Sequence, residues 1–480
     1  MSKIKIGVIG VAKVNQQKDE IKVMLKTMDD RLKRESNVEP YVCTDPLFNE
    51  RTIQDTAKKM ELRDRVDVLV MIVGTWVFSS HVISAVNDLS IPFVLFGESE
   101  EIANGNFGAS IQIRYVLQEM GKRFLYIYGS AEDERNIGKI LRYANAAHVM
   151  HSIRNKKIAT IGGKCMMMYQ TQVNEFSWKR TFGVDFPQYD TVQVFTEMKS
   201  ISDDEAQPIA DEFMKKFDRI VWKCDSGEYV AEDVFLSQAK MFLAFKRLKD
   251  MYDVEVFANK CMPEMASEIY GYKYAGCIAT CLLNEAGILT ACEADIPAGL
   301  SMLLLSRLSG QKVFFADIGR ISKDRCRLTF FNCGTAPISL ADRSQPVEIW
   351  PNPDATADEG VVDEYMKHGT DKQRGGCVRF DLENNRLVTI LRVGGNNDTL
   401  RFHVAKAYTC PREVNPGEAF GERWPGFGLD FNRDIDEFVQ NTVGHHYTLC
   451  FGDWTEELKY LADMYGIGYT LFDGTKKEQN

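Results

Sequence analysis

The first 165 residues alternate short apolar runs with amphipathic stretches. The runs include IKIGVIG at 4–10, VDVLVMIVG at 66–74 and IPFVLFG at 91–97, and helical spacing of apolar residues is seen around 18–35. Apolar runs separated by helices are typical of buried strands in a parallel sheet whose two faces are covered. The pattern predicts an N-terminal α/β domain over residues 1–165.

The alternation continues through the middle of the chain and stops near residue 345. GILTACEAD and VFFADIG are later apolar runs, whereas prolines, glycines and short alternating runs such as RLVTILRV and LRFHVAKAY prevail beyond residue 345. Alternating apolar and polar residues indicate antiparallel strands. We therefore predict an α/β fold class, with two doubly wound parallel-sheet domains at 1–165 and 166–345, followed by a mostly antiparallel β C-terminal domain at 346–480.

Composition narrows the kinds of partner. The 480 residues carry a formal net charge of -10, and an acidic surface does not attract nucleic acid or an anionic membrane. No apolar run approaches the roughly 18 residues that a membrane helix needs, and the short run at the N-terminus continues into polar residues rather than a cleavage site. We expect a cytoplasmic protein that binds a small molecule and neither nucleic acid nor membrane.

The twelve cysteines lie mostly inside apolar runs, and none forms a C-x-x-C pair. This usage is typical of a reducing compartment rather than of disulfides or a structural zinc site. We therefore expect free and mostly buried thiols.

Two carboxylates follow apolar runs on either side of a predicted helix. Glu293 ends GILTACE, Asp317 ends KVFFAD, and LSMLLLSRLSG lies between them. In a βαβ unit the two parallel strands end at the same edge of the sheet, so both acids are expected in one crevice. Close carboxylates repel unless a cation lies between them, and oxygen ligands suit Mg²⁺ or Mn²⁺. A turn cap for Asp317 and an ion pair for Glu293 are the alternatives, and Asp295 is predicted to cap the helix that begins near Pro297.

Two of the seven histidines, His445 and His446, are adjacent in VGHHYTLCFGDW. Imidazole is a common ligand for metals of this kind. YTLCF predicts a strand, in which neighbouring side chains face opposite sides, so one of the two histidines is expected to reach a given site. A surface histidine pair is the alternative.

Two further strand ends carry side chains that could line a ligand cleft. Trp76 lies in GTWVFSSH after the strongest apolar run, and Lys260 ends FANK after another. Ligands of open α/β sheets bind at the carboxyl ends of strands, so both are candidate substrate-binding residues. A helix-capping turn and a solvated lysine are the alternatives. Gly7 and Gly10 fall short of G-x-G-x-x-G, which argues against a nicotinamide cofactor.

Three segments resemble the L-fucose isomerase and L-arabinose isomerase superfamily. ACEADIPAGLSMLLLSRLSGQKVFFADI is similar to the core block with paired acids, GHHYTLCFGDW to the C-terminal histidine segment, and VGTWVFSS to the N-terminal substrate loop. The resemblance runs the length of the chain. It implies a metal-dependent aldose–ketose isomerase and a homo-oligomer, with Mn²⁺ as the usual ion and Mg²⁺ or Co²⁺ as other candidates.

By this resemblance Glu293 and Asp317 bind the metal and transfer protons, and His446 is the third protein ligand, with His445 as the neighbouring candidate. The stretch FFNCGTAP carries Asn332 where the arabinose branch has a further histidine ligand. The resemblance therefore favours the three-ligand arrangement of the fucose branch and leaves Asn332 and His445 as candidate substrate-binding residues. The substrates implied are sulfoquinovose (to sulfofructose), L-fucose and D-arabinose.

The chemistry of such an isomerase matches the residues. Interconverting an aldose and its 2-ketose moves one proton from C2 to C1 and another between O2 and O1, through an enediolate that a chelated metal stabilises. One carboxylate can transfer the carbon-bound proton while the other handles the hydroxyl proton. A hydride shift would use the same ligands. A non-catalytic sugar-binding protein is the alternative function, because two α/β lobes around a cleft also describe that class.

Overall fold

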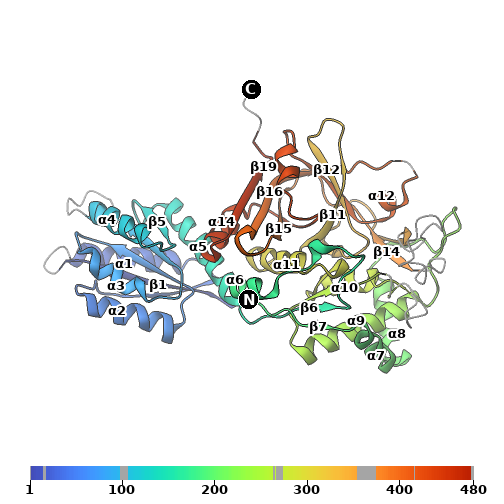
Figure 1. Ribbon diagram of the computed structural model, residues 1–480, viewed down its shortest axis with the longest axis horizontal. Coiled ribbons are helices and arrows are strands. Elements are labelled where there is room, and N and C mark those ends of the chain that lie inside the picture. The colour runs from blue at the N-terminus through green and yellow to red at the C-terminus, as the bar shows by residue number, and fades with distance from the viewer. Residues whose placement is uncertain are drawn as a thin grey trace. The chain divides into compact units, whose positions relative to one another are not determined.

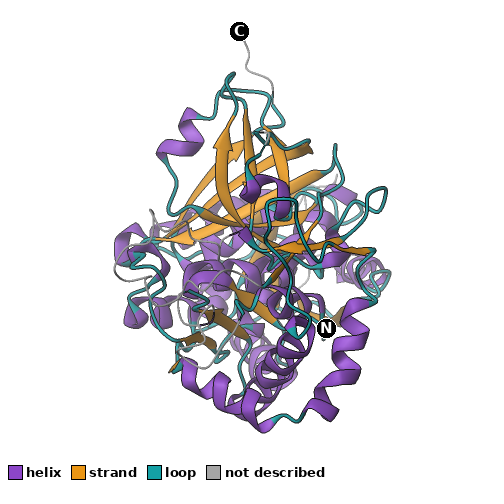
Figure 2. Cartoon of the chain, turned by 90° about the vertical axis from the view of Figure 1, so that its right-hand side faces the viewer, coloured by secondary structure: helices purple, strands orange, loops and turns teal. Residues whose placement is uncertain are grey.

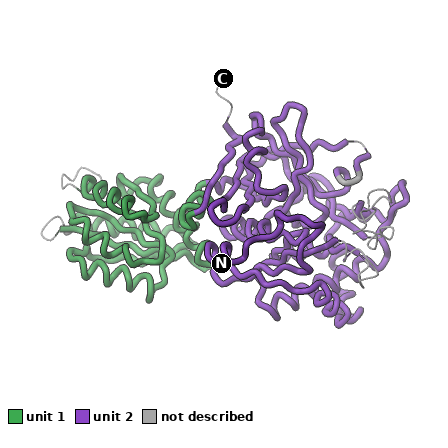
Figure 3. The backbone as a smooth tube through the Cα atoms, in the orientation of Figure 1, with its two compact units in different colours: residues 1–152, 456–466 green, residues 153–455, 467–480 purple. Residues whose placement is uncertain are grey.

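The computed structural model describes residues 2–13, 18–97, 106–262, 265, 274–353, 375–415 and 417–476. Figure 1 gives the order of the elements along the chain. The chain forms two compact units: a smaller unit of residues 1–152 and 456–466, and a larger unit of residues 153–455 and 467–480 (Figure 3). The division into three domains at residues 165 and 345 stays a prediction.

The smaller unit is built on a five-stranded sheet in which every pairing is parallel, in the order β2-β1-β3-β4-β5. All six residues of β3 are buried, as a central strand covered on both faces requires. Its strands are β1 (Ile4–Val11), β2 (Val38–Val42), β3 (Val68–Val73), β4 (Phe93–Gly97) and β5 (Leu125–Tyr128). Its helices are α1 (Lys18–Leu32), α2 (Glu50–Lys59) with the π-helix η1 (Met60–Asp64), α3 (Ser79–Asn87), α4 (Asn106–Glu119), α5 (Glu134–Ser152) and most of α14 (Thr455–Tyr465).

The larger unit contains a second parallel sheet, in the order β10-β9-β6-β7. Its strands are β6 (Ile158–Ile161), β7 (Gln188–Tyr189), β9 (Val256–Asn259) and β10 (Leu289–Ala291). The accompanying helices are α6 (Glu175–Phe182), α7 (Thr191–Ser200), α8 (Asp203–Met214), α9 (Val234–Tyr252), α10 (Cys277–Glu285) and α11 (Ile296–Ser309). A small sheet joins β8 (Arg219–Ile220), β13 (Glu348–Pro351) and β14 (Gly376–Arg379).

A seven-stranded, mostly antiparallel sheet completes the larger unit, in the order β15-β18-β11-β12-β17-β16-β19 (Figure 2). Because β15 also pairs with β16, six of these strands form a closed ring, and β19 adds to β16 in parallel. The strands are β11 (Phe314–Ile321), β12 (Arg327–Phe331), β15 (Leu387–Gly394), β16 (Arg401–Cys410), β17 (Gly426–Asp430), β18 (His446–Phe451) and β19 (Gly468–Asp473). Short helices are η2 (Tyr169–Thr171), η5 (Cys292–Ala294), η6 (Ile338–Leu340), η8 (Asn397–Thr399), α12 (Ala419–Arg423) and α13 (Asp436–Gln440). The predicted fold class is confirmed.

One structural expectation is wrong. β10 and β11 were expected to be neighbouring parallel strands of one βαβ unit, but β10 belongs to the parallel sheet and β11 to the antiparallel one. The reason is that β11 continues to Ile321 and then turns back into β12, so its hydrogen bonds go to β12 and β18. Helix α11 therefore connects two different sheets.

Two simpler expectations are consistent with the structure. All twelve cysteines are free thiols, and eight of them are buried, which confirms the prediction from their apolar surroundings. Among the helices of the described residues, none combines the length and the apolar character needed to cross a bilayer.

A buried histidine inside the antiparallel sheet makes stability depend on pH. His403 on β16 is 0% exposed, and its Nδ1 lies 2.6 Å from the Tyr447 hydroxyl. Burial, and secondarily Arg401, lowers the pKa of His403 to about 4. The unfolded chain, with the ordinary value of about 6.5, binds more protons between these two pH values, so the free energy of unfolding falls as pH falls from about 6.5 to 4.

We expect the substitution His403→Gln to remove most of this dependence, which amounts to roughly 3 kcal/mol for such a shift. Urea unfolding at pH 7 and pH 4.5 measures it. An unchanged pH slope in His403→Gln would show that other groups cause the dependence.

Candidate metal centre

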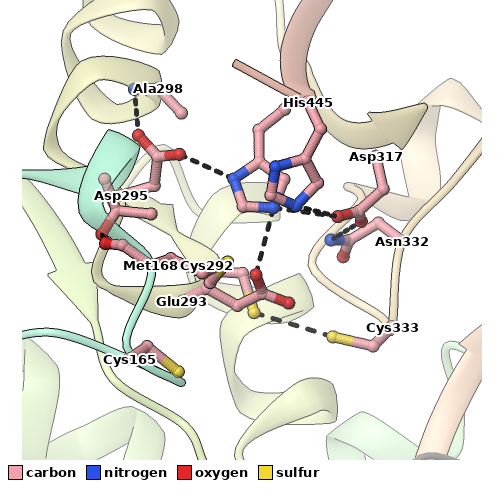
Figure 4. A network of polar contacts seen from close by, with 12 residues as sticks. Cys165, Met168, Cys292, Glu293, Asp295, Ala298, Asp317, Asn332, Cys333 and His445 are labelled. Atoms are coloured by element: carbon pink, nitrogen blue, oxygen red, sulfur yellow. Dashed lines mark hydrogen bonds and ion pairs between the residues drawn. The ribbon is translucent and has the colours of Figure 1, made fainter.

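Three candidate ligands come from three stretches of the larger unit. Glu293 lies in η5 directly after β10, Asp317 is in β11, and His446 is the first residue of β18. Asp317 and His446 are direct partners in the antiparallel ladder, which brings their side chains together. Figure 4 shows Glu293, Asp317 and His445 converging on one point.

The ligand atoms are close together. Nε2 of His446 lies 2.9 Å from Oδ1 of Asp317 and 3.1 Å from Oε2 of Glu293, and Nε2 of His445 lies 3.8 Å from Oδ1 of Asp317. One ligand atom from each of Glu293, Asp317, His445 and His446 lies within 4.8 Å of the others, a group that could hold a metal ion. The sequence prediction that the two acids share a crevice is therefore met, although their strands belong to different sheets.

The backbone at Glu293 is strained. Glu293 and Ala294 both adopt left-handed conformations, with φ of 57° and 53°. Each non-glycine residue in this region costs about 1–2 kcal/mol, and such residues concentrate at functional sites. The turn brings Glu293 beside His446 while Asp295 still caps α11 by accepting a hydrogen bond from the Ala298 amide at 2.8 Å. The predicted capping role of Asp295 is confirmed.

A divalent cation would balance the charges of this site once its ligands are deprotonated. Burial raises the pKa of Glu293 to about 8, with His446 acting against this and the charge of Asp317 adding to it. Arg392 pairs with Asp295 at 2.7 Å, but within the described residues no lysine or arginine pairs with Glu293 or Asp317. With Glu293, Asp295 and Asp317 ionised and His446 neutral, as binding of an ion requires, the three carboxylates exceed the one guanidinium by two negative charges, which a divalent cation would neutralise.

The donor set fits such an ion. Nε2 of His446 is buried and makes no hydrogen bond to any part of the chain that the structure describes, although it faces two carboxylates. Neighbouring ligands about 2.1 Å from an octahedral ion are separated by about 3 Å, the spacing found between Nε2 and the two carboxylate oxygens. Two carboxylates and an imidazole suit Mg²⁺, Mn²⁺ or a related divalent ion.

Both histidines reach the site, so the expectation that only one would do so is wrong. The strand begins at His446, and His445 follows Gly444, whose φ is 153°, so strand alternation does not apply to the pair. The two rings lie 3.8 Å apart, and Nδ1 of His445 accepts a hydrogen bond from the Gln170 side-chain amide at 3.0 Å. Burial and the neighbouring His446 lower the pKa of His445 to about 4, so its ring is neutral near pH 7.

Asn332 also contacts the cluster. Its amide oxygen accepts hydrogen bonds from the hydroxyl and the amide of Thr335, at 2.6 and 2.9 Å, and from the Gly334 amide at 3.2 Å. This orientation points Nδ2 to Oδ2 of Asp317 at 3.3 Å. Asn332 therefore steadies Asp317, and its role in substrate binding stays a prediction.

Two further residues, Lys260 and Trp76, were predicted to bind substrate. Lys260 is buried directly after β9. Trp76 belongs to the smaller unit and is 43% exposed. The involvement of both in substrate binding stays a prediction.

Arg392 and Gln170 were not predicted from the sequence, and neither was a second contact of Asp295. Oδ2 of Asp295 lies 2.6 Å from Nδ1 of His446 and 2.7 Å from Nη1 of Arg392, and the side chains of all three residues are 0% exposed. These contacts join residues about 100 to 220 positions apart, so a local sequence pattern cannot predict them. The only signal is an arginine inside the apolar run RLVTILRV, because a fully buried arginine needs a partner.

A row of thiols lies beside Glu293. Sγ of Cys292 is 3.7 Å from Sγ of Cys261 and 3.6 Å from Sγ of Cys333, and all three residues are buried. Figure 4 shows Cys292 and Cys333. Thiols behave as small apolar groups when buried. Such groups solvate charge poorly, in line with the burial that raises the pKa of Glu293.

Gly444 permits the chain to pass close to Arg392. A Cβ at this position would lie 2.9 Å from Nε and 3.0 Å from Nη2 of Arg392. We expect Gly444→Ala to lower the free energy of unfolding by about 1–3 kcal/mol, measured by urea unfolding. Gly227→Ala is the matched control, since Gly227 has a φ of 100° and open space around it. Equal losses in the two variants would exclude the contact with Arg392 as the cause.

The fold and the cluster together define a protein with two parallel α/β sheets, a mostly antiparallel sheet and a partly buried group of two acids and two histidines that could hold a metal ion. No protein-family model matches the chain. It is distantly homologous to curated sulfoquinovose isomerases. The protein of that name from Clostridium sp. is 25% identical over 363 residues, which cover 73% of this chain and 72% of the relative.

Two more relatives carry the same name. The sulfoquinovose isomerase of Priestia aryabhattai is 23% identical over 361 residues, 73% of this chain and 72% of the relative. That of Alkalicoccus urumqiensis is 20% identical over 396 residues, 80% of this chain and 81% of the relative. The chain is thus similar to sulfoquinovose isomerases over most of its length.

Proposed function

We propose that the protein is a metal-dependent aldose–ketose isomerase that converts sulfoquinovose to sulfofructose. The observation that carries the proposal is the convergence of Glu293, Asp317 and His446. The buried Nε2 of His446 lies 2.9 Å from Oδ1 of Asp317 and 3.1 Å from Oε2 of Glu293. The choice of sugar rests on the relatives, all of which are named sulfoquinovose isomerases.

Glu293, Asp317 and His446 are the proposed metal ligands, and His445 lies beside them. A divalent cation, Mn²⁺ or a related ion, would supply Lewis-acid stabilisation of the negative charge that develops on O1 and O2 of the sugar. The chain's own residues supply the proton transfers.

The two acids are the proposed catalytic residues. Glu293 has its pKa raised to about 8 by burial, so it can both take up and return a proton near neutral pH. We assign to Glu293 or Asp317 the transfer of the proton from C2 to C1, through an enediolate, and to the other acid the proton that moves between O2 and O1. A hydride shift would need the same ligands and one acid fewer.

A sugar panel tests the proposal. Purified protein loaded with Mn²⁺ is mixed with sulfoquinovose, L-fucose or D-arabinose, and ketose formation is followed by NMR. We expect sulfofructose from sulfoquinovose, and slower or no conversion of the other two. Conversion of L-fucose or D-arabinose alone would contradict the choice of sugar. Binding of sulfoquinovose without turnover would instead support the sugar-binding alternative.

A further inference from the structure

We infer that Arg392 is a positioning residue that orients the two adjacent histidines in opposite senses, so that His446 presents a lone pair to the ion while His445 presents an N–H to the substrate. The inference rests on the proposed metal centre. It assigns the protonated ring nitrogen of His445 and of His446, which the distances between ligand atoms do not determine.

Arg392 lies at the middle of the network. It is fully buried on β15, its Nη1 donates to Oδ2 of Asp295 at 2.7 Å, and its Nη2 donates to the backbone oxygen of Gln170 at 3.0 Å. A buried guanidinium is destabilising unless its partners are well placed. The rigid fork of arginine suits two acceptors held at fixed positions. Arg392 therefore links the start of α11, at Asp295, to the short helix η2, which contains Gln170.

The first branch of this network fixes His446. Asp295 accepts from Arg392 and the Ala298 amide, and its Oδ2 lies 2.6 Å from Nδ1 of His446. An ionised carboxylate only accepts hydrogen bonds, so Nδ1 carries the proton and Nε2 of the neutral ring keeps its lone pair. That nitrogen is the one buried between Glu293 and Asp317. A carboxylate behind a metal-binding imidazole sets its tautomer and orientation in this way.

The second branch fixes His445 the other way round. The backbone oxygen of Gln170 accepts a hydrogen bond from Arg392. The side-chain amide nitrogen of Gln170 lies 3.0 Å from Nδ1 of His445. The amide N–H donates, so Nδ1 accepts and Nε2 carries the proton. This N–H faces Oδ1 of Asp317 at 3.8 Å, too long for a hydrogen bond. It is therefore placed to donate to a sugar oxygen.

A third contact holds the backbone before both histidines. Gly444 lies against the guanidinium, where an added Cβ would come within 3.1 Å of Cζ as well as of two nitrogens of Arg392. Arg392 thus touches the segment that carries the histidines and, through Asp295 and Gln170, each ring separately.

Affinity for Mn²⁺ alone, without sugar, tests the inference. Free Mn²⁺ is measured by EPR during titration of metal-stripped protein. We expect Asp295→Asn to weaken binding by about 10–100-fold, because its NH₂ group would donate to Nδ1 of His446 and put the proton on Nε2. His446→Gln should weaken binding at least as much. His445→Gln should change it by less than about threefold while raising KM for the sugar.

Equal loss of Mn²⁺ affinity in His445→Gln and His446→Gln would overturn the inference, and so would unchanged affinity in Asp295→Asn. Arg392→Lys keeps the charge but not the fork, so it should lie between wild type and Asp295→Asn. Near-UV circular dichroism reports whether each variant folds, and the two histidine variants decide the matter if Asp295→Asn does not. Mn²⁺ binding with this pattern but without turnover would sink the proposed function and leave the inference standing.

Discussion

Glu293→Gln is expected to abolish isomerisation. The amide keeps the shape of the side chain but can neither carry the proton between C2 and C1 nor bind a divalent ion as an anion. Acid–base catalysis alone is worth about 10²–10⁴-fold, so we expect kcat/KM for sulfoquinovose to fall by at least about 10³-fold. Asp317→Asn should have an effect of the same order, for the same two reasons.

The unfolding temperature of Glu293→Gln shows whether its loss of activity comes from loss of the fold. Ionising Glu293 is unfavourable in the metal-free protein because burial raises its pKa to about 8, above the ordinary value of 4.5. Its contribution to stability is therefore lost as pH rises from 4.5 through 8, and metal-free Glu293→Gln should unfold at the same or a higher temperature than wild type at pH 8. Glu285→Gln, which alters a carboxylate bonded to the Ser339 amide, is the matched control and should keep wild-type activity. Wild-type turnover in Glu293→Gln would refute the site assignment.

Removing the metal is the second change with a large expected effect. Chelation should reduce turnover to background, and added Mn²⁺ should restore it. Burial opposes a proton on His446, but Asp317 and Asp295 outweigh it and raise its pKa well above the ordinary value, and the pKa of Glu293 is also raised. Both groups must lose protons to bind an ion.

Mn²⁺ affinity should therefore rise with pH up to about 8, by about tenfold per pH unit for each proton displaced. EPR titrations at pH 6, 7 and 8 measure this, and the thermal unfolding temperature should rise with added Mn²⁺. A pH-independent affinity would mean that the ion binds elsewhere. Turnover that survives exhaustive chelation would mean that no metal is needed.

The longer strands could be predicted from the sequence because their residues are either all apolar or alternate regularly between apolar and polar. VDVLVMIVG forms β3 with all its residues buried, and the alternating run RLVTILRV forms β15 in the antiparallel sheet. The partner of each strand could not be predicted. KVFFADIGRI was assigned to a parallel sheet, yet the tight turn after Ile321 pairs β11 with β12, and a preference of this kind depends on neighbours that the local pattern does not contain.

The acids and histidines of the site were recognised from residue type and position at the ends of apolar runs, and the structure brings them together. Their supporting residues were not. Asp295 was interpreted as a helix cap only, because the sequence shows its distance to Ala298 but not to His446, which is 151 positions away. Arg392 looked like one more polar residue of a strand. Long-range contacts of this kind arise only when the two sheets pack around α11.

One NMR experiment tests whether this cluster is the centre of a metal-dependent isomerase. Metal-stripped protein is mixed with sulfoquinovose in a single tube, spectra are recorded, and Mn²⁺ is then added to the same sample. We expect no ketose before the addition and steady formation of sulfofructose after it. Formation of ketose before Mn²⁺ is added, or none after it, would contradict the assignment of this cluster as the centre of a metal-dependent isomerase.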